Sequence, residues 1–151
     1  MLATMYIQNI ISMSAGILYI IPLILYYFTH NFYHIIAFVG TISVTILSEI
    51  FKYFLIGNLS IRPKNAKDCN LLCNDGNQEG MPGMPSSHSA EVAFFSGFYF
   101  QNTNNNTIRS ILIIYAGLVM LSRYIKRCHT FNQIGIGALL GLSLSWIVCH
   151  F

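Results

Sequence analysis

The chain has 151 residues, of which 54% are hydrophobic and only 9% are charged, with a formal net charge of +3. Soluble domains carry roughly 25% charged residues, and so short a soluble chain would need more polar surface than this. A soluble enzyme, a disordered chain and a nucleic-acid-binding protein with a basic stripe are therefore excluded. The charges also cluster, because neither residues 1–48 nor residues 128–151 contain any. This composition indicates an integral membrane protein.

Five apolar segments, separated by polar ones, run along the chain. They predict five membrane-spanning helices over Ile7–Phe28, Phe32–Ile56, His88–Gln101, Ile108–Ile125 and Asn132–Phe151. The first segment lacks the basic start and the short apolar core of a signal peptide. We therefore expect an all-α, polytopic membrane helical bundle that forms a single domain over residues 1–151.

One long loop, residues 57–85, separates the second predicted span from the third. It holds three of the four prolines, which favours turns over helix, and loops of this length are usually functional or disordered. In a five-span topology the loop shares one membrane face with the end of the fourth span and the start of the fifth. Seven of the eight basic residues then lie on that face. The positive-inside rule also explains such a bias, but it does not explain the histidines among them.

Three segments on this face combine residue types suited to phosphate chemistry. They are Lys52 with Ile61-Arg62-Pro63, residues 83–89 (GMPSSHS) and residues 122–133 (SRYIKRCHTFNQ). Arginine side chains bind phosphate oxygens through two parallel donors. A helix that begins at the serines of the second segment would direct free backbone N–H groups at an anion.

Two histidines in these segments could supply the reactive groups. His88 could protonate a leaving oxygen, and His129 could attack phosphorus. Gln133 lies four residues after His129, on the same face of a helix. Its amide oxygen could accept the Nδ1 proton of the imidazole and leave Nε2 free to react. Taken singly, each histidine has the alternative of an interfacial helix cap, and each arginine that of a lipid-headgroup contact.

The three segments resemble the signature of the type 2 phosphatidic acid phosphatase and haloperoxidase superfamily, of the form K-x6-RP, P-S-G-H and S-R-x5-H-x3-D. Residues 85–88 (PSSH) match the second motif with Ser for Gly, and Ser122-Arg123 followed by His129 matches the third in spacing. The variants GMPSSHS and HTxxQ resemble the dolichyldiphosphatases, membrane enzymes that remove a phosphate from dolichyl diphosphate. The resemblance covers about residues 49–141.

This resemblance implies a role for each matching residue. His129 would form a phosphohistidine intermediate, His88 would be the general acid and Gln133 would orient His129. The phosphoryl group would be bound by Arg62, Arg123, Ser86, Ser87 and Lys52. The substrate would be a polyprenyl diphosphate of the membrane, with the active site facing the lumen of the endoplasmic reticulum. No metal, cofactor or nucleic acid is expected.

Two departures from the signature leave alternatives open. Nine residues separate Lys52 from Arg62 where the signature has six, so Lys64 could take the lysine role. Gln133 replaces an acidic residue and cannot stabilise an imidazolium by charge. The rival interpretations are a lipid phosphate phosphatase of other specificity, for phosphatidic acid or undecaprenyl diphosphate, and a catalytically inactive membrane scaffold or lipid-binding protein. The positive-inside rule, which would place the loop in the cytosol, opposes the lumenal orientation.

The remaining acidic and cysteine residues receive structural interpretations. Glu49 is expected to pair with Lys52 one helical turn later. Glu91 is expected to complement the helix dipole in the first turn of the third span. A Cys69–Cys73 disulfide would brace the long loop if that face is lumenal.

Overall fold

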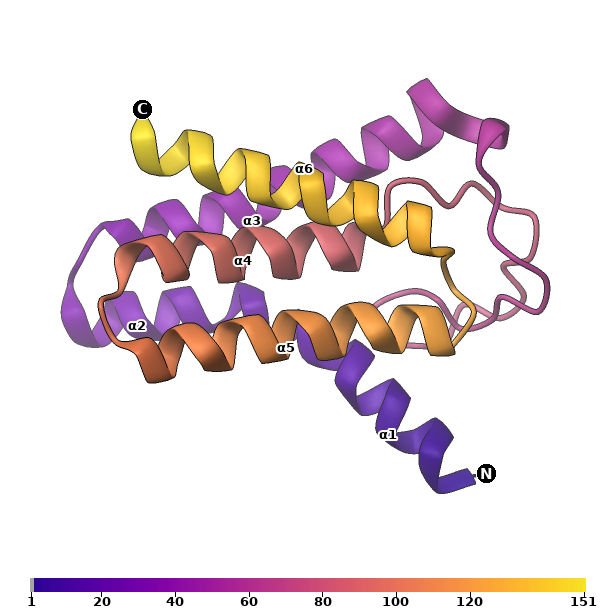
Figure 1. Cartoon of the computed structure of the whole chain (residues 1–151), viewed down its shortest axis with the longest axis horizontal. Helices are drawn as coiled ribbons and strands as arrows, with labels where there is room; N and C mark the ends of the chain where they lie inside the picture. Colours follow the sequence, from indigo (N-terminus) through magenta and orange to yellow (C-terminus); the bar gives the residue numbers. More distant parts are fainter. Residues whose placement is uncertain (1) are drawn as a thin grey trace.

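The computed structural model describes residues 2–151, and this part of the chain is helical without a β-strand. The elements are α1 (Leu2–Met13), η1 (Ser14–Tyr19), α2 (Ile21–Thr29), α3 (Tyr33–Ile50), η2 (Phe51–Ile56), η3 (Gly57–Leu59), α4 (Ser87–Asn102), α5 (Asn106–Ile125) and α6 (Phe131–His150). Two isolated β-bridges, Ile61–Pro82 and Lys67–Asn77, hold the long loop together. Figure 1 shows an elongated bundle from which α1 projects at one end.

Within residues 2–151, four helical stretches are long and apolar enough to cross a membrane. They are Tyr6–Thr29, Tyr33–Leu59, Asn106–Ile125 and Phe131–His150. The first combines α1, η1 and α2, and Pro22 lies in the first turn of α2, where its missing N–H leaves no helical hydrogen bond unmade. An all-α polytopic membrane bundle is therefore confirmed.

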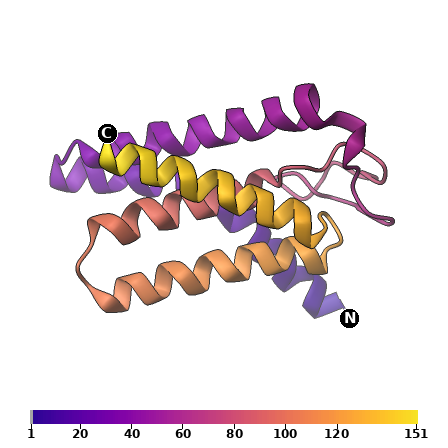
Figure 2. The ribbon, with the colours of Figure 1, turned by 45° about the horizontal axis from the view of Figure 1, so that its top comes forward.

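The third predicted span differs from the others, because α4 is the buried central helix of the bundle. Its 16 residues rise about 24 Å, less than the hydrocarbon thickness of about 30 Å. It packs against α3, α5 and α6, between the helices above and below it in Figures 1 and 2, and twelve of its residues are buried. Because α4 contacts protein rather than lipid, it can carry the histidine and glutamate that a lipid-facing helix would exclude.

Glycines bring α6 unusually close to the backbone of α4. A Cβ atom at Gly137 would lie 2.4 Å from the carbonyl oxygen of Ser86, and one at Gly141 would lie 2.2 Å from that of Ala90. Only a residue without a side chain fits at such separations. The contact places the start of α6 directly beside the start of α4.

The long loop closes one end of the bundle (Figure 1), and a disulfide ties it to the connection between α5 and α6. The tie is a disulfide between Cys69 and Cys128, whose Cα atoms are 5.5 Å apart, and Cys73 is a free thiol. The predicted Cys69–Cys73 pairing is therefore wrong. The fold brings Cys128 to the loop from 59 residues away in sequence, a pairing that spacing within the loop could not reveal.

Candidate active site

A cavity of about 370 Å³ lies at the loop end of the bundle. Its polar lining includes Glu49, Lys52, Arg62, Ser87, His88, Glu91 and His129. These residues come from α3, η2, the long loop, α4 and the α5–α6 connection. Most of the residues that the sequence singled out therefore face one space large enough for a phosphate group.

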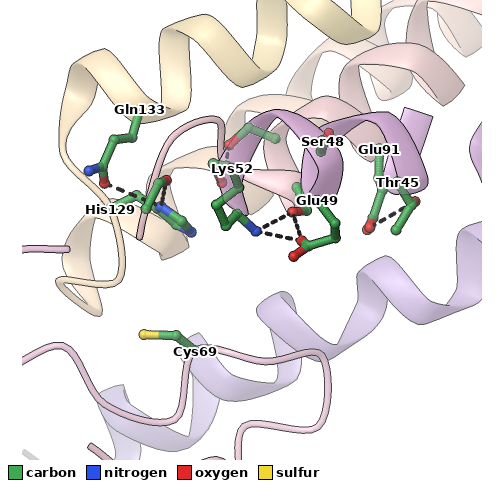
Figure 3. Close-up of polar contacts among 12 residues, drawn as sticks. Thr45, Ser48, Glu49, Lys52, Cys69, Glu91, His129 and Gln133 are labelled. Carbon is green, nitrogen blue, oxygen red and sulfur yellow. Dashed lines mark hydrogen bonds and ion pairs between the residues drawn. The ribbon is translucent and has the colours of Figure 1, made fainter. Parts of the chain in front are cut away.

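His129 is held in one orientation by two oxygen acceptors (Figure 3). Its Nδ1 lies 2.9 Å from the carbonyl oxygen of Gly83 and 3.3 Å from Oε1 of Gln133. Because both partners are acceptors, Nδ1 must carry the proton, and the lone pair is on Nε2. The imidazole is therefore in the tautomer that leaves Nε2 able to act as a nucleophile.

Gln133 has a second role that its motif position does not reveal. It is the third residue of a capping box at the start of α6, in which its Oε1 also accepts a bond of 3.1 Å from the Thr130 backbone N–H. Its Nε2 donates to the Ile61 carbonyl at 2.8 Å and to the Ser60 hydroxyl at 3.1 Å. One amide thus links His129, the start of α6 and the segment that leads into Arg62.

The charges around His129 are mainly positive. Burial lowers the pKa of His129 well below its ordinary value, the cations Arg62, Arg123 and Lys52 lower it further, and the Gly83 carbonyl raises it in part. Burial also lowers the pKa of Arg62, but a guanidinium starts so far above neutrality that it stays charged. The site therefore holds a neutral imidazole among fixed cations, an environment that an anionic ligand would stabilise.

The two arginines are buried and are each tied to one half of the disulfide. Arg62 donates to the carbonyl oxygen of Cys128 at 3.4 Å, and Arg123 donates to the carbonyl of Cys69 and to the Ser12 hydroxyl. The Nε of each arginine has no hydrogen-bond partner within residues 2–151. Arg123 is fully buried behind the cavity wall and not part of its lining. Buried unsatisfied donors of this kind are typical of ligand sites.

Lys52 reaches the cavity despite its unusual distance from Arg62 in sequence. It lies in the π-helical turn η2, and the 3₁₀ turn η3 follows before the chain reaches Arg62. The Lys52 ammonium lies 2.5 Å from Glu49 Oε1 and 2.7 Å from the Ser87 hydroxyl oxygen. The expected ion pair between Glu49 and Lys52 is therefore present. Lys64 is exposed and does not line this cavity.

Three residues at the start of α4, Ser86, His88 and Glu91, lie in different environments. Ser86 is buried and outside the cavity lining, where its hydroxyl oxygen accepts a bond of 3.0 Å from Ser89. His88 faces the cavity, and its buried Nε2 has no partner within the described chain. Glu91 lies one turn further and also lines the cavity. Its Oε1 accepts from Thr45 at 3.0 Å, while Oε2 is unpaired among the described residues. The sequence suggested only a dipole role for Glu91, although its spacing of three from His88 indicated a shared face.

Comparison with known proteins agrees with this geometry. The helical bundle and its cationic, histidine-containing cavity are those of an integral membrane protein with a site suited to an anionic group. A family model described as the PAP2 superfamily matches residues 33–151. The chain therefore belongs to the PAP2 superfamily, a membership that supports a lipid phosphatase activity. No significant match exists among curated proteins or solved structures.

Proposed function

We propose that this protein is a membrane phosphatase that converts a polyprenyl diphosphate, dolichyl diphosphate in the first instance, to the monophosphate and inorganic phosphate. The observation that carries the proposal is the arrangement of His129, with its protonated Nδ1 and free Nε2, in a cavity that His88, Arg62 and Lys52 also line. The GMPSSHS and HTxxQ segments support the polyprenyl branch. Phosphatidic acid and undecaprenyl diphosphate are the alternative substrates.

In the first step, His129 Nε2 attacks the terminal phosphorus of the diphosphate. The bond from this phosphorus to the bridging oxygen breaks as the new N–P bond forms. His88, which takes up a proton when the diphosphate anion enters the cationic site, gives that proton to the departing oxygen of the lipid monophosphate. Arg62, Lys52 and Ser87 bind the oxygens on which charge develops. Arg123 adds positive charge from behind the wall.

In the second step, water attacks the phosphorus of the phosphohistidine. His88, which gave up a proton in the first step, now accepts one from the water, so the same residue serves as acid and then as base. The N–P bond breaks, inorganic phosphate is released and His129 regains its free Nε2. Gln133 and the Gly83 carbonyl hold the imidazole in one orientation throughout.

We also propose that the site faces the lumen of the endoplasmic reticulum. The Cys69–Cys128 disulfide supports this orientation, because disulfides persist in oxidising compartments and are rare in the cytosol. The basic residues that favour the opposite orientation include Lys52, Arg62 and Arg123, whose presence the chemistry itself would require.

Phosphate release from dolichyl diphosphate by the purified full chain in detergent micelles tests the proposal. Replacing the nucleophile, His129→Ala, is expected to reduce the rate about 1,000-fold or more. The matched control is Lys67→Ala, an exposed residue outside the cavity. Unchanged release by His129→Ala would contradict the mechanism. A wild-type protein that releases no phosphate from any lipid would favour the scaffold interpretation.

The choice of substrate needs a separate comparison. Dolichyl diphosphate, undecaprenyl diphosphate and phosphatidic acid should be offered at equal mole fraction in the same micelles, and their kcat/KM values compared. We expect the two diphosphates to be preferred. A higher kcat/KM for phosphatidic acid than for either diphosphate would contradict the polyprenyl assignment.

A further inference from the structure

The polar groups around the cavity are in two different states. The Nε atoms of Arg62 and Arg123 and Nε2 of His88 have no partner among residues 2–151. Lys52 and Ser87, by contrast, both donate to one oxygen of Glu49. The ammonium lies 2.5 Å from this oxygen (Figure 3), and the hydroxyl makes a short hydrogen bond to it. An ammonium and a hydroxyl that converge on one anionic oxygen are the contacts that a phosphate oxygen would receive. The Glu49 carboxylate therefore occupies part of the anion site.

We propose that Glu49 competes with phosphate for Lys52 and Ser87, and that its return to these donors assists the release of inorganic phosphate. This inference rests on the proposed function, because Lys52 and Ser87 are taken as phosphate ligands. The Ser87 hydroxyl has a single proton, which it donates either to Glu49 or to phosphate. Two anions on the same ammonium would also repel one another. Glu49 is thus a positioning residue that acts through its two partners.

The three side chains differ in how easily they can move away. The Glu49 side chain is 42% exposed, whereas that of Lys52 is 4% exposed and Ser87 is buried. A Glu49 carboxylate that turns outward meets water and loses little solvation. A buried ammonium without an anion would be costly. Lys52 consequently needs one anion at all times, which is phosphate while substrate or product is bound and Glu49 otherwise.

This competition has a definite consequence for the catalytic cycle. After hydrolysis of the phosphohistidine, inorganic phosphate is surrounded by cations that were arranged to bind it. Glu49 weakens that binding, because its carboxylate can replace phosphate on Lys52 and Ser87. The same competition also weakens substrate binding, so loss of the Glu49 charge should tighten the binding of both substrate and product without raising kcat.

Titration calorimetry of inorganic phosphate into the purified full chain in detergent tests the inference directly. Glu49→Gln keeps the size and the acceptor oxygen and removes the charge. We expect the Kd of phosphate to fall about fivefold, with a parallel fall in KM and no rise in kcat. The control is Glu79→Gln, which removes the same charge from an exposed loop residue outside the cavity and should leave Kd unchanged.

An unchanged or higher Kd in Glu49→Gln would show that Glu49 merely holds Lys52 in place, and would overturn the inference. A second variant, Glu49→Asp, keeps the charge but shortens the side chain by one methylene. It too should lower the Kd of phosphate, and a higher Kd would likewise overturn the inference. Calorimetry requires no turnover. A protein that hydrolyses no lipid would therefore contradict the proposed function, while the phosphate affinities would still decide the role of Glu49.

Discussion

Replacing Gln133 by glutamate would restore the acidic residue of the superfamily signature, yet the structure predicts that this change is harmful. The Nε2 of the buried Gln133 amide donates to the Ile61 carbonyl at 2.8 Å and to the Ser60 hydroxyl. A carboxylate cannot donate, so Gln133→Glu leaves the Ile61 carbonyl without its partner and places a charged oxygen against it. Loss of one partner from a buried hydrogen bond costs about 1–3 kcal/mol, and more when a charge is involved. We therefore expect a destabilisation of about 2–4 kcal/mol.

The assay is thermal unfolding in detergent, followed by intrinsic fluorescence, together with phosphate release from dolichyl diphosphate. Gln133→Glu should unfold at a lower temperature and turn over more slowly than the wild type. The control is Gln101→Glu, the same exchange at an exposed position whose amide donates to the Gly97 carbonyl within one helix. If Gln133→Glu were as stable as the wild type and more active, the assignment of Nε2 to the Ile61 carbonyl would be refuted.

Three further predictions concern the pH profile, the disulfide and the helix contact. Because the pKa of His129 is lowered, its imidazole stays neutral below pH 6.5, and single-turnover rates should stay high there. Lys52→Met removes one of the charges that lower this pKa, so the acidic side of the pH–rate profile should move to higher pH. Cys128→Ser should raise KM several-fold with a smaller effect on kcat, since both buried arginines donate to carbonyls of the bridged cysteines, and reductant should have no further effect on that variant. Gly141→Ala should abolish folded yield in size-exclusion chromatography because its Cβ would lie 2.2 Å from a carbonyl oxygen, whereas Gly135→Ala, with nothing within 4 Å, should behave as wild type.

The helical bundle could be predicted from the sequence because hydropathy alone distinguishes its long apolar segments. The residues of the two histidine motifs could be found because each motif lies within a short contiguous segment of the sequence. The central position of α4 could not, since a buried helix and a spanning helix have similar composition when the bundle itself lies in lipid. Only the packing of α3, α5 and α6 around it makes the difference.

The departures at the site have one physical origin, which is contact between segments far apart in sequence. The Cys69–Cys128 bridge joins the loop to the α5–α6 connection. Glu91 lines the cavity only because α3 and α4 pack side by side. The distance of Lys52 from Arg62 in sequence departs from the signature, yet Lys52 lies in a π-helical turn and both residues line the cavity. Motif spacing describes positions along the chain and does not contain such local changes of helical geometry.

The close contact between α4 and α6 determines which parts of the site can move. At Gly137 and Gly141 the backbone of α6 approaches that of α4 with no side chain between them. His88, at the start of α4, and His129, two residues before α6, are therefore carried by elements that cannot slide past one another without a steric clash. The separation between His88, the proposed acid, and His129, the proposed nucleophile, therefore depends on glycine at positions 137 and 141. Any opening that admits a lipid must then leave the contact between α4 and α6 intact.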